Sequence, residues 1–324
     1  MGPRLRSTFP VFLVFTIVFV LCSFTLLKNE CCLEPAPEGT TTRTTAASPS
    51  LQQSHHVTKS LSQLGQMDEV SRNFLFLNAA KNSGSEILVV MLQKMQGRNN
   101  YRHIRLKSGH EQLSKIQQEE LVDKIYSKLR QEAVPLSFDQ HVYFVNFTSF
   151  DKQSPTYINL IRDPVERIIS RSSIKTRKGS DDFFYKCVTK KALNCNFKDG
   201  VPYDLSIPYF CGQDSRCMLL NDNWALNKAK RNVERYFGVV GVLEELNSTL
   251  EVLGYKIPKF FKGVQQVYQQ NLLGVFKNNK PTKVPEKIRK ALKVNLRTEY
   301  EFYEWIKRRL FAELQMLYGE HQSH

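Results

Sequence analysis

The clearest candidate for a ligand-binding site in this sequence is a basic corner at Arg162, between a predicted strand and a predicted helix. Residues 157–161 are apolar and β-branched enough for a buried strand, and Asp163 before a proline is typical of a helix start. Arg162 would then end the strand at the edge where open α/β sheets bind ligands, with Ser170 two turns inside the helix. The corner could bind a phosphate, or Arg162 could form a structural ion pair with Asp163 or Glu166.

A second candidate anion site follows the apolar residues 73–77, which predict another buried strand. A polar loop of small residues comes next, and a helical pattern covers residues 86–96. Backbone amides at a helix N-terminus point toward an anion and a lysine adds charge, so the arrangement resembles a P-loop. The Walker A pattern is absent, which argues against an ATPase or GTPase, and a lysine in a polar turn is often merely solvated. The loop residues are Lys81, Asn82, Ser83, Gly84 and Ser85.

A histidine in the middle of the chain is a candidate general base. Residues 141–147 predict a strand with His141 at its leading edge. Histidine can take up a proton near neutral pH, so a histidine at the mouth of a sheet could activate a hydroxyl group. A lone histidine is more often structural than catalytic.

The charge balance favours a polyanionic partner. Lysine and arginine outnumber acidic residues by 46 to 31, which gives a formal charge of +15. Acidic polysaccharide, anionic lipid and nucleic acid all fit such a surplus. A basic loop follows the helix that starts after Asp163, although a charge run is usually a solvated face. Its basic residues are Lys175, Arg177 and Lys178, and lysines recur at Lys186, Lys190 and Lys191.

The N-terminal region predicts a membrane anchor and a linker. Residues 9–27 are apolar without one charge, a length that suits a bilayer. Arginines precede this run, so the positive-inside rule leaves a cytosolic tail at residues 1–8 and sends the rest into the lumen. A cleaved signal peptide is the alternative. Residues 28–70 are rich in Thr, Ser and Pro and predict a flexible stem, which leaves residues 71–324 as the folded domain. A luminal compartment disfavours nucleic acid as the partner.

The lumen permits disulfides and glycosylation. Four cysteines of the folded region form two closely spaced pairs, Cys187 with Cys195 and Cys211 with Cys217, if neighbours are joined. A zinc site is not expected, because neither pair is a Cys-x-x-Cys knuckle. Sequons stand at Asn146 and Asn247.

The remaining patterns alternate between helices and strands. Helices are expected over residues 112–132 and 223–236, a strand over 237–243, a helix from Glu244 to near Gly254, and a long helical pattern from Pro285 onward. We therefore expect an α/β fold with a central, mainly parallel sheet flanked by helices and a ligand at the carboxyl ends of the strands.

Several blocks in the same order resemble the uronyl 2-O-sulfotransferase and heparan sulfate 2-O-sulfotransferase family of Golgi carbohydrate sulfotransferases. The similarity covers roughly residues 72–318 and leans toward the uronyl branch. The blocks are residues 141–147, 157–167 with Ser170, 207–213, 224–226 and 240–245.

The resemblance implies a sulfotransferase fold. It also implies transfer of a sulfuryl group from 3′-phosphoadenosine 5′-phosphosulfate (PAPS) to the 2-hydroxyl of a uronic acid. The acceptor would be a glycosaminoglycan: chondroitin sulfate, dermatan sulfate or heparan sulfate. Lys81 would stabilise the leaving phosphate within the P-loop-like phosphosulfate loop, Arg162 and Ser170 would bind the 3′-phosphate, and His141 would be the catalytic base. The resemblance implies no metal, supports disulfides Cys187–Cys195 and Cys211–Cys217, and suggests a Golgi single-pass type II membrane protein and a homotrimer.

The chain departs from the family pattern on the acceptor side. Asn78 stands where relatives carry an arginine, and Asp139 stands where the heparan sulfate branch has a second histidine. We therefore expect a kept nucleotide site and an altered acceptor, such as an unusual glycosaminoglycan or a glycoprotein glycan. The alternative is a catalytically inactive relative that binds glycans or assembles with a partner. Candidate acceptor contacts are Asn78, Arg105, Lys175, Arg177 and Lys178.

Overall fold

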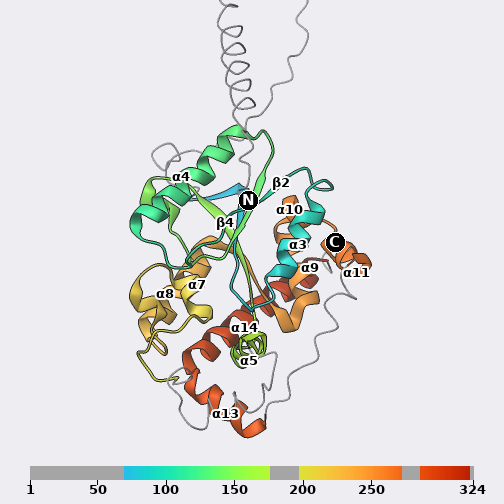
Figure 1. The fold of residues 1–324 in the computed structure, drawn as a ribbon. Helices are drawn as coiled ribbons and strands as arrows, with labels where there is room; N and C mark the ends of the chain where they lie inside the picture. The colour runs from blue at the N-terminus through green and yellow to red at the C-terminus, as the bar shows by residue number, and fades with distance from the viewer. Residues whose placement is uncertain (1–68, 176–196, 272–284, 322–324) are drawn as a thin grey trace, which may run out of the picture. The chain divides into compact units, whose positions relative to one another are not determined.

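A parallel β-sheet forms the centre of the folded region. The computed structural model describes residues 69–175, 197–271 and 285–321. In this part of the chain, five strands lie in the order β2-β3-β1-β4-β5, and every neighbouring pair is parallel (Figure 1). The predicted α/β fold with a parallel central sheet is therefore confirmed. The strands are β1 (Val70–Asn78), β2 (Arg102–Arg105), β3 (Leu136–Gln140), β4 (Ser154–Ile161) and β5 (Phe237–Val242).

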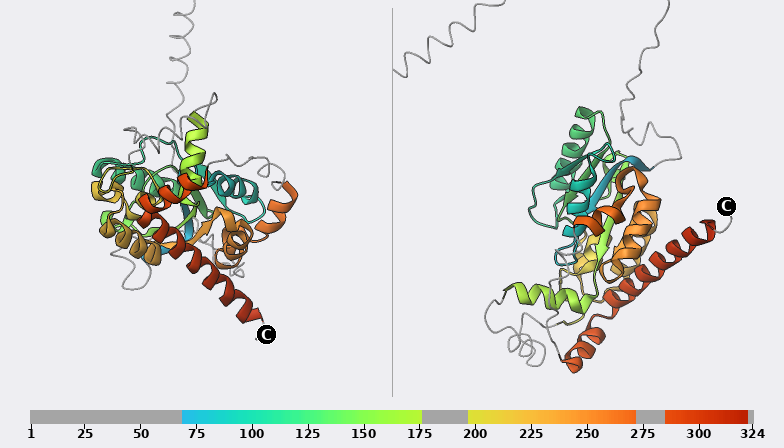
Figure 2. Two further views of the ribbon diagram at one scale, coloured as in Figure 1. Left: turned by 90° about the horizontal axis from the view of Figure 1, so that it is seen from below. Right: turned by 90° about the vertical axis from the view of Figure 1, so that its right-hand side faces the viewer.

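Helices lie on both sides of the sheet, because parallel neighbours need crossover connections (Figures 1 and 2). The α-helices are α3 (Glu86–Met95), α4 (Lys115–Gln131), α5 (Pro164–Lys175), α7 (Ser206–Cys211), α8 (Asn223–Tyr236), α9 (Leu246–Lys256), α10 (Pro258–Phe261), α11 (Val264–Asn271), α13 (Glu286–Asn295) and α14 (Arg297–His321). Short 3-10 turns are η1 (Phe147–Phe150), η3 (Ser215–Met218) and η4 (Leu243–Glu245).

An aromatic cluster fills the core beside the central strands. Phe76 of β1 and Tyr157 of β4 are both fully buried, and their rings meet edge to face with centroids 5.4 Å apart. The Tyr157 hydroxyl donates to the Val145 carbonyl at 2.8 Å, so this polar group has a partner inside the core. The cluster fixes the register of β1 against β4, whose carboxyl ends carry the candidate site.

Helix α14 closes the described part of the chain. Its first half is buried through Phe302, Ile306 and Leu310, and its second half projects away from the sheet (Figure 2). The single helical pattern predicted from Pro285 is in fact two helices, because the chain turns at Leu296, which has a φ of −111°.

The strand predicted over residues 141–147 was wrong. Strand β3 ends at Gln140, so His141 follows a strand and does not open one. The apolar residues after it are buried but pair with loops: the Tyr143 amide donates to the Glu111 carbonyl at 2.9 Å, and the Tyr143 carbonyl accepts from the Gln213 side chain at 2.8 Å. Strands β2 and β3 were not predicted.

The predicted amphipathic helix over residues 112–132 begins later, at Lys115. Ser114 caps it, since its hydroxyl accepts from the Gln117 amide and the Gln117 side chain accepts from the Ser114 amide. Ile116 in its first turn is 70% exposed, whereas Leu121, Ile125 and Leu129 form its buried side.

The membrane span and stem predicted for residues 9–27 and 28–70 lie, apart from the last two residues, outside the described part of the chain. Within the described ranges, none of the helices combines the length and hydropathy that crossing a bilayer requires.

Candidate active site

A cavity of about 710 Å³ opens where the carboxyl ends of four strands meet. It is bordered by the loop after β1, by His141 after β3, by Arg162 after β4 and by Leu243 after β5. Sites at this edge are the rule for open parallel sheets. The residues that line it are Ala80, Lys81, Asn82, Gly84, Ser85, Glu86, Ile87, His141, Arg162, Ser170, Leu243, Leu246 and Tyr268.

The loop after β1 is compact and turns through left-handed backbone. Asn82 has a φ of 59° and Gly84 a φ of 85°. A Cβ on Gly84 would lie 2.7 Å from a methyl of Leu243, so only glycine fits this turn. Ser83 is a correction to the sequence prediction: its hydroxyl is buried, donates to the Ala80 carbonyl at 2.8 Å, and does not line the cavity. Ser83 shapes the loop and Ser85 borders the cavity.

Lys81 is held through its backbone while its ammonium is half exposed. The Lys81 carbonyl accepts from the Arg167 guanidinium at 2.9 Å, and its amide lies 3.5 Å from the Tyr209 hydroxyl. The side chain forms an ion pair with Glu111. An ammonium at this position can neutralise an anion in the cavity.

The ring of His141 is oriented by a single backbone group. Its Nδ1 lies 2.8 Å from the Ala79 carbonyl oxygen, which can only accept a hydrogen bond. Nδ1 therefore carries the proton, and Nε2 of the neutral ring keeps a lone pair. A histidine in this tautomer can take a proton from a hydroxyl group at Nε2.

The sequence left open whether Arg162, in the basic corner after β4, faces a ligand site or forms a structural ion pair, and the structure shows both. Arg162 and Ser170 line the cavity together, and Arg162 also lies 3.9 Å from the Glu166 carboxylate. Glu166 has a closer partner, because Arg289 donates a hydrogen bond to it. The Asp163 carboxylate caps α5 by accepting from the Glu166 amide at 3.0 Å. Arg162 is thus only loosely paired and remains available to an anion.

A buried arginine that the sequence analysis did not single out joins the two halves of the site. Arg167 lies on α5 one turn before Ser170 and is 3% exposed. Besides the Lys81 carbonyl, it bonds to the Ser206 hydroxyl at 3.2 Å and lies over the Tyr209 ring at 5.4 Å. Its spacing from Ser170 was the available signal, since residues three apart share a helix face.

The carboxylate of Glu299 on α14 holds the backbone of Ser206, whose hydroxyl is a partner of Arg167. It accepts from the Ser206 amide at 2.9 Å and from the Ile207 amide at 3.0 Å. Burial raises the pKa of Glu299, and the Arg167 charge and both amides act against that rise. The C-terminal helix is thereby coupled to the Lys81 loop.

Replacement of Arg167 by methionine should lower the free energy of unfolding by about 3–5 kcal/mol, because it removes a buried guanidinium that pairs with Asp204 at 3.9 Å and leaves the Lys81 carbonyl and the Ser206 hydroxyl without their donor. Urea denaturation measures this. Arg171→Met is the matched control: Arg171 lies on the same helix, is half exposed and pairs with Asp204 at 3.3 Å, so its loss should cost under about 1 kcal/mol. Equal effects of the two substitutions would contradict the role assigned to Arg167.

Asn78 is not available to a substrate, which corrects its prediction as an acceptor contact. The side chain is fully buried, donates to the Tyr209 carbonyl at 2.6 Å and accepts from Asn159 at 3.0 Å. It connects β1, β4 and α7 inside the core. Asn78 is therefore a structural residue of the core.

Arg105, a predicted acceptor contact, is not among the residues that line the cavity, and its side chain is already paired. It donates to both carboxylate oxygens of Glu86 at 2.8 and 3.0 Å and lies 3.3 Å from Asp139. The Asp139 side chain, on β3, is buried and lies 3.0 Å from His103 of the neighbouring strand β2. Asp139 is not among the residues that line the cavity. The side chain of Lys175, together with Arg177 and Lys178, lies outside the described residues.

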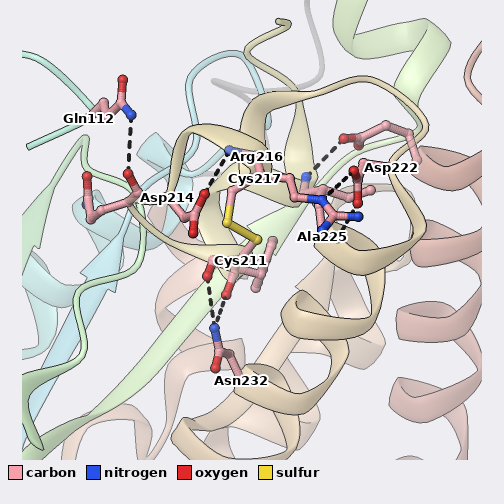
Figure 3. The surroundings of a disulfide bond; sticks show 12 residues. Gln112, Cys211, Asp214, Arg216, Cys217, Asp222, Ala225 and Asn232 are labelled. Atoms are coloured by element: carbon pink, nitrogen blue, oxygen red, sulfur yellow. Dashed lines mark hydrogen bonds and ion pairs between the residues drawn. A yellow bond between two sulfur atoms is a disulfide. The ribbon is translucent and has the colours of Figure 1, made fainter. Parts of the chain in front are cut away.

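A disulfide joins Cys211 to Cys217 beside the site, which is the pairing that the resemblance implied (Figure 3). Cys187 and Cys195 fall outside the described residues. Of the two sequons, Asn247 is exposed on α9, and Asn146 is half-buried with its side-chain oxygen accepting from the Thr148 amide at 3.2 Å. Among the residues that the structure describes, there is no cluster of three or more potential metal ligands.

The fold and the cavity define an α/β protein with a candidate ligand site at the carboxyl edge of a parallel sheet. Comparison with known proteins shows that the chain belongs to the family of uronyl 2-sulfotransferases and heparan sulfate 2-O-sulfotransferases. The chain is 32% identical over 275 residues to the Drosophila melanogaster uronyl 2-sulfotransferase homolog pip, 31% over 256 residues to human uronyl 2-sulfotransferase, and 29% over 259 residues to human heparan sulfate 2-O-sulfotransferase 1. The resemblance seen in the sequence is therefore confirmed.

The matches cover different shares of the proteins compared. They take in 74%, 71% and 74% of this chain, and 53%, 60% and 71% of the respective relatives. The chain thus spans little more than half the length of the two uronyl relatives. No model of a known protein family matches the chain.

Proposed function

We propose that the chain is a PAPS-dependent sulfotransferase that modifies the 2-hydroxyl of uronic acid residues in a glycosaminoglycan or a related glycoprotein glycan. One observation supports this most: a single cavity brings together Lys81, His141 and the pair Arg162 and Ser170. These residues come from three different strand ends, and the donor nucleotide has two separate phosphate groups to engage. The relatives are named as 2-O-sulfotransferases.

The cavity suits such a donor. Its volume lies within the roughly 300–1,000 Å³ typical of small-molecule sites. Lys81 and the loop ending at Ser85 would hold the 5′-phosphosulfate, and Arg162 with Ser170 the 3′-phosphate. Leu243, Leu246 and Tyr268 line the same cavity and would offer an apolar wall to a base ring.

The residues divide the chemistry between them. His141 Nε2 would accept the proton of the acceptor hydroxyl as the new bond from oxygen to sulfur forms. The Lys81 ammonium would stabilise the charge that builds on the phosphate oxygen as the old bond to sulfur breaks. When bound, PAPS supplies the sulfuryl group and a good leaving group. None of these steps calls on a metal ligand.

The setting of this reaction is part of the proposal. The surplus of basic residues suits an acidic polysaccharide, and the N-terminal apolar segment suits a Golgi single-pass type II protein with a luminal catalytic domain. A homotrimer follows from the resemblance alone.

The direct test is transfer of radiolabelled sulfate from PAPS by the luminal part of the chain to a panel of desulfated glycosaminoglycans. Transfer to a uronic acid 2-hydroxyl is expected. The rival is an inactive relative that binds glycans, favoured by the buried Asn78 in place of the family arginine. No transfer to any acceptor, together with no thermal stabilisation by 3′-phosphoadenosine 5′-phosphate (PAP), would favour that rival, because a decayed enzyme should have lost the nucleotide site.

Removal of the Arg162 guanidinium should abolish the preference for a 3′-phosphate. Arg162→Ala should weaken PAP binding by about ten- to a hundredfold, the range for a charge-assisted hydrogen bond, and leave adenosine 5′-phosphate binding unchanged. Calorimetric titration with both nucleotides measures this. Arg171→Ala is the control, because Arg171 lies on the helix that follows Arg162 but is not among the residues that line the cavity. An equal loss for both nucleotides would contradict the assignment.

A further inference from the structure

The Lys81 ammonium is already paired with a carboxylate that the proposed reaction does not use. Glu111 forms the ion pair from the segment between β2 and α4. The Glu111 side chain is 21% exposed and that of Lys81 45%. A partly buried carboxylate is screened less by water and salt than one on the surface, so its effect on Lys81 is larger. An anion that reaches Lys81 must compete with it.

A closed ring of hydrogen bonds fixes the backbone that carries Glu111. The Glu111 carbonyl accepts from the Tyr143 amide at 2.9 Å, and the Tyr143 carbonyl accepts from the Gln213 side chain at 2.8 Å. The same Gln213 side chain accepts from the Leu113 amide at 2.6 Å. The Gln112 side chain adds a bond to the Gln213 carbonyl at 3.2 Å (Figure 3).

The disulfide fixes the other end of this ring. Gln213 lies inside the short loop that Cys211 and Cys217 close, and the Cys211 carbonyl accepts from Asn232 of α8 at 3.1 Å (Figure 3). The path from α8 through the disulfide loop to Glu111 is therefore continuous. Glu111 is placed by the fold and is not a loose surface side chain.

We propose that Glu111, positioned by Gln213, is a built-in counterion of Lys81 that competes with the donor's 5′-phosphate group. It would keep Lys81 compensated until the nucleotide binds and would weaken the hold on the spent nucleotide. This rests on the proposed function, because the competing anion is the nucleotide of that reaction. Glu111 is a positioning residue for Lys81 and takes no proton or bond in the transfer.

The test is calorimetric titration with PAP at low salt. Glu111→Gln removes the charge and keeps the shape, and PAP should bind about three- to tenfold more tightly. The gain should shrink as salt is raised. In a Lys81→Met background the same substitution should give a smaller gain, since the competition for the ammonium is gone and only the repulsion between Glu111 and the phosphate is relieved. Glu132→Gln is the matched control, because Glu132 pairs with Arg102 at the opposite end of the sheet.

A second substitution separates the counterion from other effects of position 111. Gln213→Ala breaks the ring and leaves the Glu111 charge in place, and it should also tighten PAP binding, with no further gain when combined with Glu111→Gln. Weaker binding in Gln213→Ala would contradict the positioning role.

Each outcome decides between the two proposals. If the wild-type protein binds PAP and Glu111→Gln binds it with the same affinity, the counterion proposal is overturned and the proposed function stays intact. If Glu111→Gln binds PAP and the wild-type protein does not, the counterion proposal is supported and the proposed activity of the natural chain is overturned. If neither protein binds PAP, both are overturned.

Discussion

Replacement of His141 by alanine is expected to lower sulfate transfer by about 100- to 10,000-fold, the range for loss of a general base. The reason is the single hydrogen bond from Nδ1 to the Ala79 carbonyl, which leaves Nε2 as the only basic nitrogen of the neutral ring. The affinity for PAP should change less than twofold, because the proposed phosphate contacts come from other residues. Transfer assays and titration of the same preparation measure the two quantities.

The control for this prediction is His110→Ala. His110 is exposed in the segment before α4 and does not line the cavity, so its loss should leave transfer unchanged. His141→Gln is a second check, since an amide can still donate to the Ala79 carbonyl but cannot take the proton. Retained transfer in His141→Gln would remove His141 as the base. Lost PAP binding in His141→Ala would point to a collapsed site instead.

Local sequence patterns were sufficient for the strand, corner and helix around Arg162 and for the loop after β1. The corner at Arg162 is specified by an apolar strand, a capping aspartate and a proline, all within ten residues. The loop after β1 is specified in the same way by small residues before a helix. Short-range backbone preferences decide both, so each could be predicted before the structure was known.

The acceptor side could not be predicted because it depends on contacts between distant segments. Residues 141–147 have the composition of a strand, but the sheet already has β3 ahead of them, and Tyr143 finds its partners in loops at Glu111 and Gln213. Asn78 looks like a site residue in the motif and is buried in the core. Nothing near Glu111 in the sequence indicates that it reaches Lys81. Burial and long-range pairing overrode the local signal in each case.

Replacement of Lys81 by alanine is expected to lower the rate of transfer by about 100- to 1,000-fold, the cost of removing one preorganised group that stabilises developing charge. PAP binding should fall less than tenfold, because Arg162 and Ser170 still hold the 3′-phosphate. The loss should therefore appear mainly in kcat. Steady-state kinetics with PAPS, together with titration by PAP, separate the two effects.

The ion pair between Lys81 and Glu111 affects how the loss of Lys81 is measured. Lys81→Ala leaves the Glu111 carboxylate facing the phosphate without its cation, so part of the measured loss is repulsion and not missing catalysis. Lys81→Ala combined with Glu111→Gln removes that repulsion and should recover PAP binding while kcat stays low. Lys81→Arg keeps the charge and should retain most of the affinity. Recovery of kcat in the double variant would mean that Lys81 serves to neutralise Glu111 and does not stabilise the leaving phosphate.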